Sequence, residues 1–204
     1  MNELVLDIET TGLPPKGGQY YKDYKKYPYP VSISWLYKGI MHDYIINQKG
    51  REVPRAASNI HGITTKIANA SPHMIKNVIH DLMLDCQKAS IIVGHNIFFD
   101  LSIIKANIIR ELQNSEYTKE QKSNYYSMFN YAVSKEKRID TMMKTVKFCK
   151  LPSPRGSGYK WPRLEELYKI LFNETFNAHR SKDDVEATHR CFVELVKKNV
   201  IVIP

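Results

Sequence analysis

The sequence predicts an α/β protein in which helices pack against a sheet of mixed strand direction. An apolar run near the N-terminus is followed by two segments in which apolar and polar residues alternate with a period of two. Segments with the spacing of amphipathic helices come next, with one further short strand between them. Three antiparallel strands followed by helices and a later strand are typical of α/β layers around a mixed sheet.

The first strand contains two carboxylates. Asp7 and Glu9 lie in and just after the apolar run Leu4, Val5, Leu6 and Ile8. Side chains alternate across a strand, so both acids share one face. Two like charges this close raise one pKa or require a counter-charge. No Lys or Arg lies in residues 2–13, so a bound cation is the natural candidate.

The loop after this strand is rich in tyrosine and lysine. Residues 14–30 hold five tyrosines and four lysines. Aromatic rings that stack on bases, beside cations that meet phosphates, are typical of single-strand binding. We therefore expect Lys22, Lys25 and Lys26 to bind substrate. The alternative is a tyrosine-rich loop that folds back over the sheet edge.

The next elements are a hairpin, a helix, a strand and a helix. Residues 31–37 and 40–47 alternate around a Lys-Gly turn, which predicts a hairpin. Residues 71–89 predict an amphipathic helix with Ser71 as N-cap and proline at its first position. A strand at 90–94 and a helix at 97–112 follow.

The last part of the chain is predicted to be helical after a polar stretch. Residues 113–137 are polar and break the pattern, as an insertion does. Helices are expected at 139–149, 163–172 and 182–198. A loop rich in Pro, Gly and Ser is expected at 152–158. The overlapping segment "RGSGYK" lacks the phosphate-binding P-loop pattern and predicts a turn. We expect the Trp161-Pro162 pair to cap the next helix rather than to bind a base.

Composition limits the classes of protein. The 204 residues, with 43% hydrophobic and 25% charged, fit one globular domain over 1–204. Three distant cysteines without a C-x-x-C pair favour neither a disulfide framework nor a zinc site, and they suggest a reducing compartment. No apolar run approaches a membrane span and no signal-peptide core is present. We expect a soluble intracellular protein, cytoplasmic or nuclear, with no membrane partner.

The formal net charge of +9 favours a polyanionic partner such as nucleic acid. A generic basic surface is the alternative reading of the charge.

Three segments in chain order resemble one enzyme family. "LVLDIETTGL" (4–13), "VGHNIFFDLSII" (93–104) and "NAHRSKDDVEAT" (177–188) resemble the motifs of the DEDDh group of DnaQ-like 3′-to-5′ exonucleases. "NIHGIT" (59–64) and "IDTMMKT" (139–145) are weaker matches. A sister group carries tyrosine four residues before its last aspartate, whereas Arg180 stands there in this chain.

The resemblance covers nearly the whole chain and implies an RNase H-like fold. The expected architecture is a mixed five-stranded sheet with helices packed on both faces. It makes residues 1–204 a single exonuclease domain, with the tyrosine-rich loop at 14–30 and an insertion at 113–137.

The resemblance also implies a set of catalytic residues. Two divalent cations, Mg²⁺ or Mn²⁺, are expected on Asp7, Glu9, Asp100 and Asp184. In the family pattern Asp7 bridges both ions, Glu9 and Asp184 hold the ion that carries the attacking water, and Asp100 acts through ordered water. His179 is the general base that takes the proton from that water. We assign Asp184 rather than its neighbour Asp183 from the histidine spacing.

Each acid alone is also compatible with a structural role, at a strand end, on a helix surface or in a first helical turn.

Further positions match family residues that contact the terminal nucleotide. They are Thr10, Gly12, Leu13, His61, Asn96 and Phe99. For Phe99 the alternative is core packing, since a phenylalanine in a helix is usually buried.

Three functions remain open from the sequence. The first is a metal-dependent 3′-to-5′ exonuclease on single-stranded or frayed DNA. The second is an RNA 3′-end trimming exonuclease, since no residue pattern tests for the 2′-hydroxyl. The third is a nuclease-like module that binds nucleic acid or a polymerase or repair complex without cutting. The sequence does not define an oligomeric state.

Overall fold

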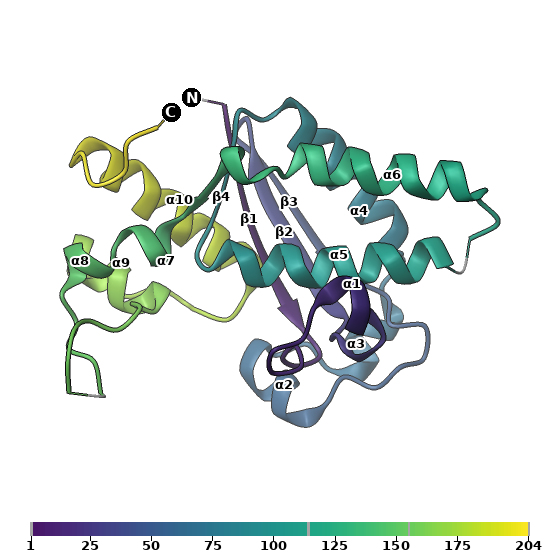
Figure 1. The fold of residues 1–204 in the computed structure, drawn as a ribbon. Coiled ribbons are helices and arrows are strands. Elements are labelled where there is room, and N and C mark those ends of the chain that lie inside the picture. Colours follow the sequence, from purple (N-terminus) through teal and green to yellow (C-terminus); the bar gives the residue numbers. More distant parts are fainter. Residues whose placement is uncertain (1, 114, 155, 204) are drawn as a thin grey trace.

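The fold is centred on a five-stranded mixed sheet, as predicted. The computed structural model describes residues 2–113, 115–154 and 156–203. The strand order is β3-β2-β1-β4-β5. The strands are β1 (Glu3–Thr10), β2 (Pro30–Tyr37), β3 (Ile40–Ile45), β4 (Ile91–Gly94) and β5 (Arg138–Asp140). The first three pair antiparallel, whereas β4 and β5 continue the sheet in parallel (Figure 1).

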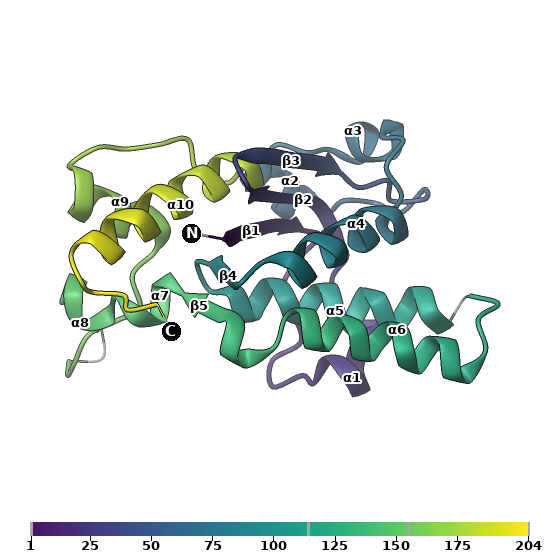
Figure 2. The same cartoon turned by 90° about the horizontal axis from the view of Figure 1, so that it is seen from above.

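Helices cover both faces of this sheet (Figure 2). Leu4, Leu6 and Ile8 of β1 face one core, which α4 (Ile75–Lys88), α5 (Ile97–Gln113) and α6 (Lys119–Ala132) close. Val5 faces the opposite core, under α9 (Leu164–Phe172) and α10 (Ser181–Lys197). Side chains alternate along β1, so Asp7 and Glu9 share the Val5 face and point toward the layer of α9 and α10.

Short helices fill the connections. They are α1 (Tyr20–Asp23), the 3₁₀ turn η1 (Tyr24–Lys26), α2 (Arg55–His61), α3 (Thr65–Ala70), the 3₁₀ turn η2 (Lys135–Lys137), α7 (Thr141–Lys144) and α8 (Val146–Cys149). No helix among the described residues is long and apolar enough to cross a membrane.

The predicted start of the helix at 71–89 is wrong. The helix α4 begins at Ile75, with Met74 at its N-cap. Ser71 instead ends α3, and its hydroxyl donates to the carbonyl of Ile45 at 2.5 Å. A serine that satisfies a strand carbonyl in this way no longer caps the following helix.

The helix predicted at 139–149 is also wrong in its first residues. Arg138–Asp140 form β5 and extend the sheet beside β4, and two short helices follow. A three-residue strand is fixed by pairing with its neighbour, which a local pattern does not reveal.

Most of the polar stretch at 113–137 is helical. It forms α6, capped by Thr118 and Gln121, and Phe129 of that helix is fully buried in the core. Position 114 of the predicted insertion lies outside the described residues, as does position 155 of the loop at 152–158.

Candidate active site

The first strand extends beyond its parallel neighbour, and this opens the site. The short strand β4 pairs only with Glu3, Leu4 and Val5 of β1, so the second half of β1 is bound on its β2 side alone. Asp7 and Glu9 lie in that free half, on the face that α10 covers. Ligand sites in open α/β sheets lie at such carboxyl ends of strands.

Three carboxylates meet there. Carboxylate oxygens of Asp7, Glu9 and Asp184 all lie within 4.8 Å of one another. Asp184 comes from the first turn of α10 and is only 8% exposed. No lysine or arginine ion pair with these three acids occurs among the described side chains. The cluster therefore carries an unbalanced negative charge.

That imbalance is visible in the pKa values. Burial first, and then the charges of Asp100, Asp184 and Glu9, raise the pKa of Asp7 well above its ordinary value. Burial and the charge of Asp184 raise the pKa of Glu9 to about 7. Burial is also the main reason that the pKa of Asp184 is raised to about 7. A cation at this position would relieve the repulsion.

Asp100 approaches the cluster from the other layer. It lies in the first turn of α5 and is 3% exposed. Burial raises its pKa, and the charge of Glu9 contributes. Its own charge in turn raises the pKa of Asp7. Asp100 is thus near enough to act on Asp7, but it stands outside the three-carboxylate group.

His179 is joined to the cluster through its backbone. Its N–H donates to Asp184 Oδ2 at 3.0 Å, which its left-handed backbone (φ 70°) permits. Its imidazole Nε2 lies 3.7 Å from Glu165 Oε1, in the first turn of α9, and the ring is about half exposed. The adjacent Asp183 points elsewhere, because its carboxylate accepts from the side chain of Asn177.

Serines attach the start of α10 to the sheet. Ser181 Oγ lies 2.8 Å from Ser32 Oγ and 2.7 Å from Ser34 Oγ, and Ser34 donates to Asp43. Ser34 and Ser32 stand beside Asp7 and Glu9 in the β1–β2 register. These buried hydrogen bonds fix Asp184 opposite the two acids of β1.

The positions matched to nucleotide contacts differ in exposure and in local contacts. Leu13 is 81% exposed, whereas His61 is buried with its ring close to the Thr10 backbone. Asn96 has a left-handed backbone and donates its N–H to Asp140 Oδ1, and Phe99 packs against the core. Thr10 Oγ1 donates to the Gly12 carbonyl at 2.6 Å.

Most tyrosines of the loop at 14–30 are used for packing. Tyr20 and Tyr24 pack against the core, and the Tyr27 hydroxyl donates to the Gly18 carbonyl. The Tyr29 ring contacts two guanidinium groups, those of Arg51 and Arg110, at 4.0 and 4.1 Å. Tyr21 is 53% exposed. The three predicted lysines are exposed, and Lys26 lies 3.8 Å from Asp23.

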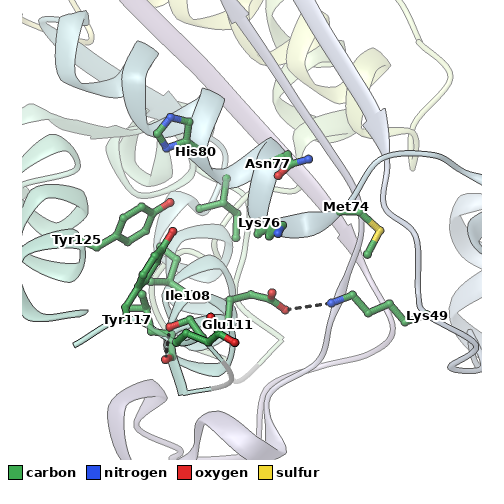
Figure 3. Close-up of a pocket in the computed structure, with 13 residues that line it drawn as sticks. Lys49, Met74, Lys76, Asn77, His80, Ile108, Glu111, Tyr117 and Tyr125 are labelled. Atoms are coloured by element: carbon green, nitrogen blue, oxygen red, sulfur yellow. Dashed lines mark hydrogen bonds and ion pairs between the residues drawn. The ribbon is translucent and has the colours of Figure 1, made fainter. Parts of the chain in front are cut away.

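A separate cavity lies at the far end of α5. It has a volume of about 720 Å³ and is lined by residues that include His80, Glu111 and Tyr125. Lys49 and Glu111 form an ion pair across it at 3.8 Å (Figure 3). It shares no residue with the carboxylate cluster.

Comparison with known proteins identifies the family. The model of the RNase T exonuclease family matches residues 4–192. This chain belongs to that exonuclease family. No curated protein matches it significantly.

Solved exonuclease I structures share the fold of this exonuclease domain. E. coli exonuclease I with a dA16 oligonucleotide superposes with a TM-score of 0.68 at 20% identity, over 97% of this chain and 41% of that chain. The enzyme of Methylocaldum szegediense gives a TM-score of 0.67 at 17% identity, over 97% and 40%. A product-bound exonuclease I gives 0.66 at 16% identity, over 98% and 44%. The chain spans about two fifths of the length of these proteins.

The exonuclease domain contains two site residues that the sequence analysis did not single out. Asp140, at the end of β5, raises the pKa of Asp100 and caps α7. Glu165 contacts His179 and raises the pKa of Asp184. The weak match "IDTMMKT" contains Asp140 and was the available signal. Glu165 comes from a separate segment, and only the folded chain brings it to the site.

The donor set of the exonuclease domain fits a divalent cation. Asp7, Glu9 and Asp184 supply carboxylate oxygens, which are the hard ligands that Mg²⁺ and Mn²⁺ prefer. No cysteine lies in the group, and a bound cation would favour the ionised forms of acids whose pKa values burial has raised.

Proposed function

We propose that this chain is a metal-dependent 3′-to-5′ exonuclease that shortens single-stranded or frayed DNA. The proposal rests on one observation above the others. Acids from the first strand and the last helix converge into a cluster that has no lysine or arginine ion pair among the described side chains. A domain of 1–204 with an exonuclease-family match over most of its length is consistent with this.

Asp7, Glu9 and Asp184 would hold the divalent cations. Asp100 lies close enough for its charge to raise the pKa of Asp7. Two bound Mg²⁺ or Mn²⁺ ions would supply positive charge to both the attacking and the leaving oxygen of the phosphodiester. Ser181 holds Asp184 in place, and the N–H of His179 orients its carboxylate.

His179 would accept the proton of the attacking water. Its half-exposed ring lies against Glu165, and an imidazole is a common general base in catalysis. To reach a water at the acids, the ring must turn away from Glu165. The 3.7 Å contact between these two side chains is partly exposed, so it opposes the rotation only weakly.

Single-stranded DNA is the substrate we favour. Two of the superposed exonuclease I structures contain dA16 and dT13 oligonucleotides. The net charge of +9 favours a phosphate backbone, and Lys22, Lys25 and Lys26 lie on the loop that leaves β1. Leu13 would contact the last bases as an apolar wedge, beside Thr10 and Gly12.

The test compares digestion of labelled DNA and RNA of equal sequence in Mg²⁺, with linear and covalently closed single strands. We expect mononucleotides from linear DNA and intact circles, because an exonuclease needs a free end. Faster digestion of RNA would support the trimming alternative. Rapid linearisation of circles would indicate an endonuclease, and binding without any digestion would indicate a nucleic-acid or polymerase-binding module.

A further inference from the structure

The two tryptophans of the chain lie in opposite environments. Trp35 is fully buried in the sheet, whereas 64% of Trp161 is exposed. A tryptophan side chain is usually well buried, because it carries a large apolar surface. The expected capping role for the Trp161-Pro162 pair is wrong, since Arg163 is the N-cap of α9 and Glu166 completes that cap.

The backbone on both sides of this exposed ring is fixed. The Pro162 carbonyl accepts from His95 Nε2 at 3.0 Å, and His95 Nδ1 bonds Thr141 Oγ1 at 2.9 Å. On the other side, the N–H of Lys160 donates to the Leu151 carbonyl at 2.9 Å. The ring therefore projects from a rigid segment, and its exposure does not reflect a loose loop.

This segment borders the carboxylate cluster. His95 follows β4 directly and precedes α5, the helix that carries Asp100. Four residues after Trp161, Glu165 lies 3.7 Å from His179 and raises the pKa of Asp184. A hydrogen bond at Pro162 and the contact of Glu165 with His179 thus connect the chain that follows Trp161 to the site.

The surroundings of the ring suit a nucleic acid strand. Tyr159 is 48% exposed in the same segment, and the exposed Arg163 follows two residues after Trp161. On the other side, Lys160 is held in an ion pair with Glu166, so Arg163 is the exposed cation beside the ring. Proteins bind single strands with exposed aromatic rings that stack on bases and with nearby cations that contact phosphates.

We propose that Trp161 is a stacking site for a base of the single strand whose 3′ end lies at the carboxylate cluster. The proposal rests on the proposed nuclease function and adds a specific contact to it. Stacking on a base face tolerates any sequence, so Trp161 would contribute to affinity rather than to sequence choice.

Tryptophan fluorescence tests this directly, because Trp161 is the exposed tryptophan and Trp35 is shielded. A short phosphorothioate oligothymidylate, which resists cleavage, is added in Mg²⁺ while its binding is followed by the anisotropy of a label. We expect saturable quenching of wild-type fluorescence with the same midpoint as the anisotropy change. In Trp161→Phe the quenching should vanish while binding persists.

Affinity gives a second measurement. Trp161→Ala should weaken oligonucleotide binding by about 5- to 100-fold, the range expected for one base–aromatic stack, and Trp161→Phe should restore most of it. Tyr131→Ala is the matched control, because Tyr131 is an aromatic side chain on α6 that is 75% exposed. It should bind as the wild type does.

The outcomes separate this inference from the proposed function. Oligonucleotide binding without quenching, or with unchanged affinity in Trp161→Ala, overturns the stacking site and leaves the nuclease function intact. No binding of the wild type to DNA or RNA overturns both.

Discussion

His179 combines a backbone that is fixed by a hydrogen bond with a side chain that is half exposed. Its backbone is fixed to Asp184, while its ring is free enough to leave Glu165. His95, by contrast, has both ring nitrogens bonded, to Thr141 and to Pro162, and burial lowers its pKa. Of these two histidines, His179 is the one whose ring can exchange protons with solvent.

We predict that His179→Ala lowers kcat by roughly 10²- to 10⁴-fold with little change in KM, the usual size of a general-base contribution. Single-turnover digestion of a labelled oligonucleotide measures this. His95→Ala is an unsuitable control because it would free the Trp161 segment, so His80→Ala, on exposed α4 surface, serves instead. A His179→Ala rate within a few-fold of wild type would assign the proton to another acceptor.

The acids also make stability depend on pH. The pKa values of Glu9 and Asp184 are about 7 in the folded chain, above the roughly 4 of exposed carboxyls. Between these values the folded state holds more protons than the unfolded state, so the free energy of unfolding falls as pH rises. We expect the Tm of the metal-free protein to decrease from pH 5.5 to pH 8.

Asp184→Asn removes one of the titrating acids and lowers the repulsion on Glu9. Its Tm should therefore fall less than that of the wild type over the same pH range, and Mn²⁺ should raise the Tm of the wild type most at pH 8. Scanning calorimetry of both proteins measures the difference. An equal decrease of Tm with pH in the two proteins would mean that the cluster does not titrate as described.

At the scale of elements, the loop at 14–30 combines packing with exposed charge. Its tyrosines lie largely against α5 and the core, and the buried Arg110 donates to the Tyr27 and Pro28 carbonyls. This leaves the lysines of α1 and η1 at the surface, at the end of the strand that carries Asp7.

We predict that a triple variant weakens single-strand binding and flattens its salt dependence. In this variant Lys22, Lys25 and Lys26 are all changed to Gln. Each lost phosphate contact removes about 0.7 from the log–log slope, so three contacts remove about 2. Anisotropy titrations over a series of salt concentrations measure this.

The matched control is a second triple variant, in which Lys119, Lys135 and Lys197 are changed to Gln. These exposed lysines lie on α6, η2 and α10, so the variant loses the same charge at other places. Equal slopes for the two triple variants would show that the loop lysines only interact with water.

At the scale of the whole molecule, the sequence predicted the sheet and the acids for a physical reason. A buried strand with two same-face acids is a local pattern, and the motifs around Asp100 and Asp184 lie in strongly periodic helices. The short strand β5, the start of α4 and the order of α6 depend on pairing and packing between distant segments. The contact of His179 with Glu165 and the exposure of Trp161 also depend on packing between distant segments.

The central claim is that the convergence of β1 and α10 creates a metal-dependent nuclease site. Mn²⁺ binding by calorimetry, paired with exonuclease assays, tests it in Asp7→Ala, Asp184→Asn and the control Asp183→Asn, whose side chain bonds Asn177 outside the cluster. Circular dichroism should show all three folded. We predict that the first two lose metal binding and cleavage, because the acids act as a unit, while Asp183→Asn keeps both. Wild-type metal affinity and full Mg²⁺-dependent activity in Asp7→Ala or Asp184→Asn would contradict the account.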